Sequence, residues 1–141
     1  LHDADPSERA FALTQARRVL AEPDLHPLFA PGTLAEVPIT AEIGGRRLHG
    51  VIDRLILASD TVLAIDIKTN ATVPATPVEC PEGILRQMGA YEAALSAVYP
   101  NRKVQTGILW TQTAHLMLLP HNLVSAARAR TPHLDLEPTA T

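Results

Sequence analysis

Four residues in the first half of the chain carry the side chains best suited to chemistry: Glu36, Asp53, Asp66 and Lys68. Lys68 follows Asp66 by two residues in a strand-like run, so alternation along the strand would place both side chains on the same face, with Ile65 and Ile67 on the other face beneath helices. Arg54 alternates to the face opposite Asp53, where we expect it to pair with an acid under the sheet. Carboxylate oxygens suit Mg²⁺, which also binds substrate phosphate. The pattern predicts metal-assisted phosphodiester hydrolysis, in which Lys68 orients the attacking water or stabilises developing negative charge.

Two tight turns, at 44–45 and 59–60, decide whether the acids meet. They separate three strand-like runs, at 34–43, 47–57 and 62–68. If each turn is a two-residue hairpin, Glu36 lies opposite Asp53 and Asp53 opposite Asp66, with Cβ atoms about 4.5–5.5 Å apart. A bulge or a longer turn would shift a pairing by one residue and send an acid to the other face. The alternative interpretation is three separate, solvated surface acids.

Helices and further strands are expected around this meander. Asp5 caps a helix that begins at Pro6 and turns Phe11, Val19 and Leu20 inward, and prolines then indicate a loop over 22–32. Pro38 cannot donate a ladder hydrogen bond, so its strand is expected at the sheet edge. The remaining predicted elements are a loop at 72–81, an amphipathic helix from 84 to 98, strands at 104–110 and 116–119, and a helix at 123–130.

Three short motifs occur in a fixed order: Gly50-Val-Ile-Asp-Arg54, Asp66-Ile-Lys-Thr69 and Gln87-Met-Gly-Ala-Tyr91. Together they resemble the motif series of the RecB-like branch of the PD-(D/E)xK nucleases, and the stretch 25–39 resembles the segment before the site in AddA-type helicase-nuclease subunits. AddB-type subunits typically carry four cluster-binding cysteines, whereas this chain has only Cys80. The resemblance implies an α/β (α+β) restriction-endonuclease-like core, a mixed sheet with an antiparallel three-strand meander flanked by helices.

The resemblance also implies roles for individual residues. Asp53 and Asp66 would ligate Mg²⁺, or Mn²⁺ in its place, together with the main-chain carbonyl of Ile67. Lys68 would be catalytic, with Glu36 as a further catalytic acid carried over less directly. Gln87 and Tyr91 would contact DNA, although from the residues alone they are equally a polar helix flank and a half-buried core tyrosine. The family usually has a metal-binding histidine on an upstream helix, and no histidine of this sequence lies in that context.

The composition suits one domain with its own core. The chain has 141 residues, 46% hydrophobic and 19% charged. We expect a single domain over 1–131, a disordered tail over 132–141, and a chain cut from a larger protein whose upstream helix is missing. Its apolar stretches are too short to span a membrane, which favours a cytoplasmic protein. A net charge of -3 counts mildly against a DNA partner. The single cysteine, Cys80, excludes a disulfide framework within the chain, and its position at a helix start could lower its pKa.

These observations favour a metal-dependent DNA nuclease, most simply an exonuclease, within a helicase-nuclease that acts with a second subunit in double-strand-break repair and recombination. The chain contains no phosphate-loop motif, so helicase and ATPase activity would belong to the rest of the parent protein. Two alternatives stay open: a non-cleaving DNA- or partner-binding module, and a stand-alone endonuclease or resolvase of the same fold.

Overall fold

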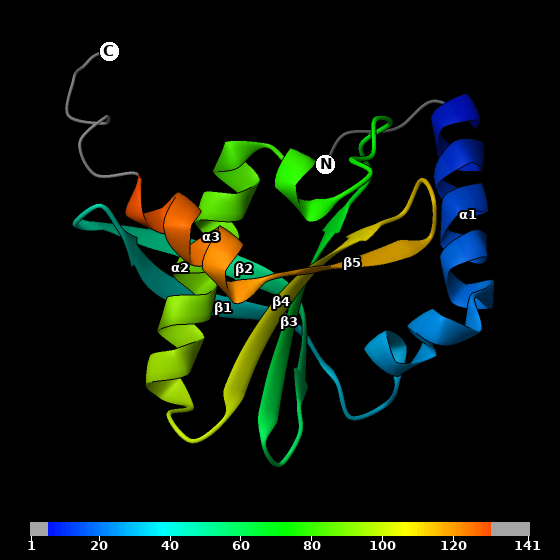
Figure 1. Ribbon diagram of the computed structural model, residues 1–141. Helices are drawn as coiled ribbons and strands as arrows, with labels where there is room; N and C mark the ends of the chain where they lie inside the picture. The colour runs from blue at the N-terminus through cyan, green and yellow to red at the C-terminus, as the bar shows by residue number, and fades with distance from the viewer. Residues whose placement is uncertain (1–5, 131–141) are drawn as a thin grey trace.

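The structure, a computed structural model, describes residues 6–130, and these build one five-stranded sheet in the order β1-β2-β3-β4-β5 (Figure 1). The strands are β1 (Leu34–Ile43), β2 (Arg46–Leu57), β3 (Thr61–Lys68), β4 (Lys103–Trp110) and β5 (His115–Leu119). β1, β2 and β3 form an antiparallel meander, and β3 pairs with β4 in parallel. The helix α2 (Glu82–Val98) makes the crossover that a parallel pair requires. The predicted mixed α/β fold is confirmed, and β1 lies at the sheet edge as Pro38 predicted.

Both hairpin registers are the predicted ones. Gly44 and Gly45 have φ values of 57° and 79°, which glycine adopts without a steric penalty in a two-residue hairpin turn. The pairs Leu34↔Leu55 and Val37↔Ile52 flank Glu36 and Asp53, and the β2–β3 ladder ends at Arg54↔Ile65. Beyond that pair β2 continues along β1, whereas β3 continues along β4. The two strands therefore separate at Asp53 and Asp66.

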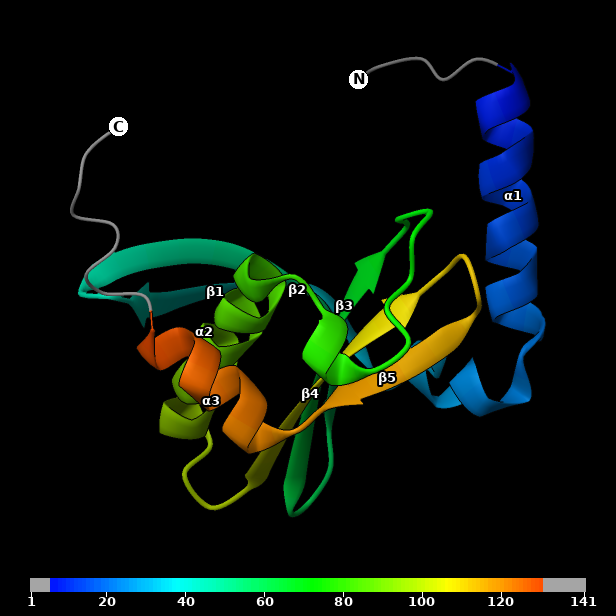
Figure 2. The same cartoon turned by 45° about the horizontal axis from the view of Figure 1, so that its top comes forward.

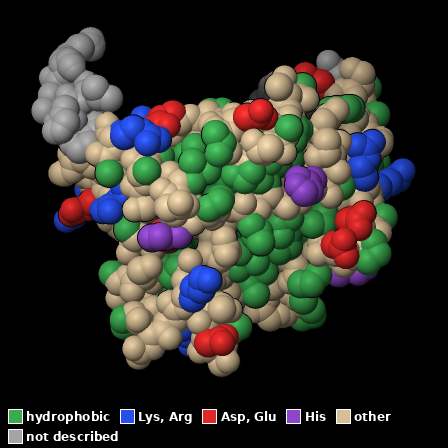
Figure 3. Space-filling model, viewed as in Figure 1, with side chains coloured by type: hydrophobic (Ala, Val, Ile, Leu, Met, Phe, Trp, Pro, Cys, Tyr) green, Lys and Arg blue, Asp and Glu red, His purple; other side chains and the backbone are tan. Residues whose placement is uncertain are grey.

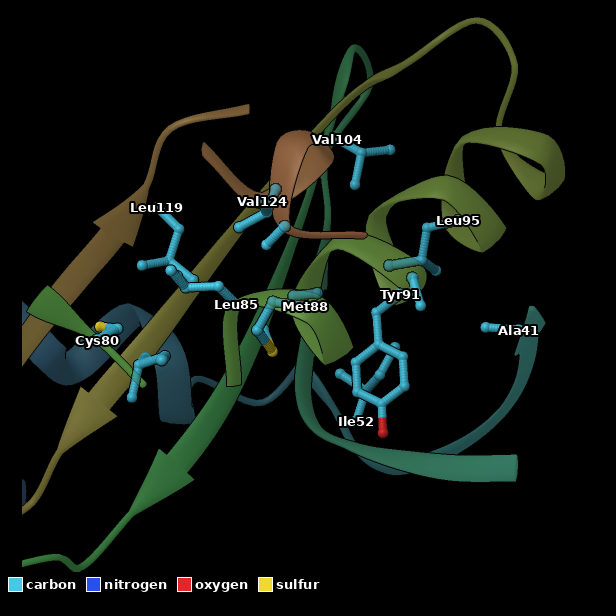
Figure 4. Packing of buried hydrophobic residues seen from close by; sticks show 14 of the residues in the cluster. Ala41, Ile52, Cys80, Leu85, Met88, Tyr91, Leu95, Val104, Leu119 and Val124 are labelled. Carbon is cyan, nitrogen blue, oxygen red and sulfur yellow. The ribbon is translucent and has the colours of Figure 1, made fainter. Parts of the chain in front are cut away.

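Helices cover both faces of the sheet. α2 and α3 (His121–Ala129) pack on one face, where Ala64, Ile108 and Leu119 belong to the same core as Met88 (Figure 4). On the other face Ile65, Leu109 and the partly buried Ile67 pack with Val19 of α1 (Pro6–Ala21) and with the 3-10 helix η1 (Pro23–Phe29). The prediction that Ile65 and Ile67 lie beneath helices is confirmed, so alternation directs Asp66 and Lys68 toward α2.

α1 differs from its prediction. Val19 is buried, but Phe11 and Leu20 are 55% and 59% exposed, so the expectation that they face inward is wrong. The reason is that the buried face of α1 includes a polar side chain, Gln15, which hydrogen-bonds to the turn between β4 and β5. Figure 2 shows α1 standing beside that turn, at the margin of the sheet.

Smaller differences concern the loops. The loop expected over 22–32 contains η1, which has Pro23 in its first turn. Cys80 is buried next to Met117, and burial raises its pKa, so the expectation of a lowered value is wrong. The capping residue Asp5, the tail 132–141 and His2 lie outside the described residues. No helix within residues 6–130 has the length and apolarity needed to cross a bilayer.

Candidate active site

Asp53 and Asp66 meet at the point where β2 separates from β3. Asp53 Oδ2 accepts a 2.7 Å hydrogen bond from the main-chain N–H of Ile67, which fixes it against β3. Asp66 is 8% exposed, and its burial raises its pKa. Lys68 lowers that pKa, and the Asp53 carboxylate, within hydrogen-bonding reach, raises it. Two carboxylates held this close, with one of them desolvated, favour a bound cation or proton.

Lys68 belongs to the same cluster. Its Nζ lies 2.9 Å from Asp66 Oδ2, while its side chain stays 29% exposed. The distance defines an ion pair, and Lys68 lowers the pKa of Asp66 through this contact. A buried carboxylate that is held by one partly exposed ammonium group still favours the approach of a cation or another donor. Lys68 thus neutralises part of the charge without saturating the site.

α2 contributes Tyr91 to the same corner. The ring is 2% exposed, and its hydroxyl packs against the β2 main chain at Gly50, next to Val51. Burial raises the pKa of Tyr91, the charges of Asp66 and Asp53 raise it further, and the Val51 contact lowers it. Figure 4 shows the Tyr91 ring reaching from α2 toward Ile52 of β2. Gln87, one turn earlier, is half-buried and makes no side-chain hydrogen bond within residues 6–130.

Glu36 does not join the two aspartates. Over residues 6–130 no group of three or more His, Cys, Asp or Glu side chains is placed to hold one metal ion. Glu36 is exposed and has a φ of 52°, a left-handed conformation that interrupts the alternation of β1. The register places Glu36 across from Asp53 as predicted, but the local backbone does not produce the expected three-carboxylate pocket.

Arg54 lies on the opposite face, as strand alternation predicted. Its Nε donates to the Leu28 carbonyl at 2.9 Å and its Nη2 to Thr33 Oγ1 at 3.0 Å, and its guanidinium stacks over Phe29 at 5.0 Å from the ring centroid. Its partners are neutral oxygens and a ring rather than the acid that we expected. Arg54 therefore ties η1 beneath the strand that carries Asp53.

Two residues near the site, Gln15 and Thr111, could not be identified from the sequence. Thr111 donates through its main-chain N–H to the Lys68 carbonyl at 3.0 Å and through its hydroxyl to Gln15 Oε1 at 2.7 Å. Gln15 also donates to Gln112 Oε1 at 2.7 Å. A glutamine in an exposed helix and a threonine after a strand are ordinary residues, so only the three-dimensional structure connects α1 to the end of β3.

The donor set fits a single divalent cation with incomplete protein ligation. Asp53 and Asp66 supply two carboxylates, of which Asp66 is 8% exposed and is desolvated by its burial. The main chain of Ile67 lies between them. Mg²⁺ is commonly held by one or two carboxylates, with waters and substrate phosphate completing its shell. The residues present therefore suit such an ion.

The face of the molecule shown in Figure 3 has no continuous basic surface. Among the described residues in this view, Lys and Arg side chains are scattered, and hydrophobic side chains occupy much of the middle. The net charge of the chain is -3. Attraction of a polyanion to this face would thus depend on a few local cations rather than on a continuous basic surface.

Comparisons with known proteins show the family and the fold of the chain. A model of the PD-(D/E)XK nuclease superfamily matches residues 3–135. A crystal structure from Eubacterium rectale, of a protein provisionally assigned as an exonuclease, superposes with a TM-score of 0.53 at 16% identity, over 81% of this chain and 47% of that one. The protein SSO0001 has a TM-score of 0.42 at 16% identity, over 94% of this chain and 66% of that one. The chain spans about half the length of the first structure. A search of curated proteins gave no match.

Proposed function

Because the chain belongs to the PD-(D/E)XK nuclease superfamily, we propose that it hydrolyses phosphodiester bonds in DNA with a divalent cation held by Asp53 and Asp66. The observation that carries this proposal is the meeting of these two carboxylates at the β2–β3 separation, with Lys68 at 2.9 Å from Asp66. An exposed sheet face without a ligand would not favour such a pair, since like charges placed opposite one another destabilise a sheet.

Each residue then has a distinct task. Asp53 and Asp66, with the Ile67 carbonyl, bind the cation, which would polarise the scissile phosphate and lower the pKa of the attacking water. Lys68 keeps its ammonium group partly exposed beside Asp66, where it can hold the attacking water or stabilise negative charge on the phosphoryl oxygens. Gln87, half-buried on α2 and free of side-chain partners in the described chain, is available to hydrogen-bond a DNA strand. Glu36 is assigned a peripheral role, because it is exposed and separate from the pair.

Finer features of the function rest on the motif resemblance. We propose Mg²⁺ as the natural ion with Mn²⁺ as a substitute, an exonuclease that acts on DNA ends, and a place in an AddA-type helicase-nuclease that works in the cytoplasm with a second subunit in double-strand-break repair. The Eubacterium rectale neighbour, whose assignment is an exonuclease, supports the preference for ends. The order of the three motifs supports the helicase-nuclease parent.

A cleavage assay tests the proposal. The full chain is incubated with linear and circular DNA, single-stranded and duplex, in Mg²⁺ and in a chelator. We expect cleavage only with the metal, faster on linear than on circular DNA, and absent in Asp66→Asn. Asp60→Asn, at an exposed turn, is the matched control and should cleave normally. Equal cleavage by the wild type and Asp66→Asn, or cleavage in the chelator, would show that this site is not the catalytic centre.

A further inference from the structure

Tyr91 is buried in a position from which its ring cannot reach solvent. It is 2% exposed, although the charges of Asp66 and Asp53 both act on its hydroxyl. The hydroxyl packs against the β2 main chain at Gly50, three residues before Asp53, and the adjacent main chain of Val51 lowers the pKa of Tyr91. A side chain that is closed to solvent cannot contact a DNA strand. Because Tyr91 is adjacent to both site carboxylates, it can still affect their positions from the protein interior.

β2 needs an external support at this point. From Arg54 onward β2 pairs with β3, but over the stretch that contains Val51 its ladder partners among the described residues belong to β1 alone. Ile52 and Leu55, three residues apart, both face the α2 core, so strict alternation is broken at Asp53. The direction of the Asp53 side chain is consequently not fixed by a regular ladder.

We infer that Tyr91 is a positioning residue, whose hydroxyl supports the β2 main chain at Gly50 so that Asp53 stays opposite Asp66 in the cation site. This inference rests on the proposed function, and it replaces the expectation that Tyr91 contacts DNA. Residues that orient metal ligands in this way commonly affect metal affinity by about 10- to 100-fold when they are replaced.

Gly50 of β2 is the residue against which the Tyr91 hydroxyl packs. A Cβ at position 50 would overlap the Tyr91 hydroxyl and crowd the ring atoms next to it. The clash would involve a buried side chain on a packed helix, which cannot simply swing into solvent. Gly50 is therefore needed for close approach, and Gly50 and Tyr91 should behave as a coupled pair. Gly83, whose Cβ would meet nothing within 4 Å, provides a matched control.

The experiment compares Tyr91→Phe, which removes only the hydroxyl, with Tyr99→Phe, which alters the other tyrosine at the far end of α2. Calorimetry measures Mn²⁺ affinity, and a fluorescent single strand measures DNA affinity in a chelator. We expect Tyr91→Phe to weaken Mn²⁺ binding by about 10-fold or more, to lower kcat with little change in KM, and to leave DNA affinity within about 2-fold of the wild type. Tyr99→Phe should match the wild type in all three.

A double-mutant cycle adds a second readout that a generally damaged fold would not reproduce. Gly50→Ala should weaken Mn²⁺ binding strongly in the wild type and less in Tyr91→Phe, because the hydroxyl is then absent, while Gly83→Ala should have no effect in either background. Unchanged Mn²⁺ affinity in Tyr91→Phe, reduced DNA affinity in the chelator, or additive effects of Gly50→Ala and Tyr91→Phe would overturn the inference. A wild type that binds no Mn²⁺ and cleaves no DNA would instead overturn the proposed function.

Discussion

Asp66→Asn should make the metal-free protein more stable while it removes activity. Asp66 is 8% exposed and lies beside Asp53, and both its burial and the Asp53 charge raise its pKa. The substitution keeps the shape of the side chain, removes the buried charge and gives Asp53 a neighbouring N–H donor in place of a second carboxylate. Against this, it removes the contact with Lys68, which is 29% exposed.

The stabilising effects of the substitution outweigh the loss of the contact with Lys68. A partly exposed ion pair contributes about 0–1 kcal/mol. Desolvation of a buried polar group costs about 1–3 kcal/mol, and a hydrogen bond to a charged group contributes about 1.5–3 kcal/mol. We therefore expect Asp66→Asn to raise the free energy of unfolding by about 1–3 kcal/mol, or Tm by roughly 3–10 °C for a domain of this size. Thermal and urea denaturation in a chelator provide the measurement, with Asp60→Asn as the control.

The pH dependence gives an independent check of the cause. The pKa of Asp66 is raised in the folded state above its ordinary value of 3.8. Its contribution to stability is then fully present below that value and is lost as pH rises through the folded-state pKa. The stability gap between Asp66→Asn and the wild type should accordingly be small near pH 3.8 and reach its maximum near neutrality. A variant that is less stable than the wild type at pH 7 without metal, or a gap that does not change with pH, would refute the reasoning.

Three further results are expected. Lys68→Ala should lower the rate of DNA cleavage by about 100-fold or more, because Lys68 acts on the reacting groups. It should not weaken Mn²⁺ affinity, because Lys68 competes with the cation for Asp66, and a parallel loss of Mn²⁺ binding in calorimetry would contradict this. Arg54→Ala should lower the free energy of unfolding, measured in urea, by about 2 kcal/mol, because the Leu28 carbonyl and Thr33 lose a charged donor. The control Arg46→Ala, at the exposed hairpin turn, should change it by under about 0.5 kcal/mol. Equal denaturation midpoints for the two variants would show that the Arg54 contacts contribute nothing. The stability of the wild type relative to Tyr91→Phe should fall as pH rises above 10.0, because burial and the nearby aspartates raise the pKa of Tyr91 above that ordinary value; urea unfolding curves that shift equally for both proteins would refute it.

The β1–β2–β3 meander could be predicted closely because its register depends on short stretches of sequence. A two-residue turn fixes the register of a hairpin, so the turns at 44–45 and 59–60 were enough to place Asp53 opposite Asp66. Pro38 fixed the position of β1 at the edge, since a missing donor is tolerated there. Alternation then predicted that Ile65 and Ile67 pack under the sheet and that Arg54 lies on the face away from Asp66.

The differences arise where tertiary contacts override local pattern. The apolar residues Phe11 and Leu20 suggested an inward face of α1. Instead, Gln15 of α1 hydrogen-bonds to the turn after β4. No short-range sequence pattern predicts this contact between distant segments. Register alone placed Glu36 across from Asp53, yet a left-handed φ at Glu36 keeps it out of the pair. Backbone conformation at single residues and the docking of distant segments are not encoded in periodicity.

The irregular backbone at Glu36 has a consequence for the behaviour of the protein at high concentration. An edge strand exposes a row of unpaired main-chain groups that invites strand-to-strand aggregation, and proline, charged side chains and local distortions all oppose it. β1 combines the three: the left-handed, acidic Glu36, the donor-free Pro38 and the exposed carboxylate of Glu42. The other edge, β5, is only 5 residues long and is followed directly by Pro120. Both borders of the sheet are thus poor templates for an added strand, and the distortion that keeps Glu36 out of the carboxylate pair also protects the molecule from self-association.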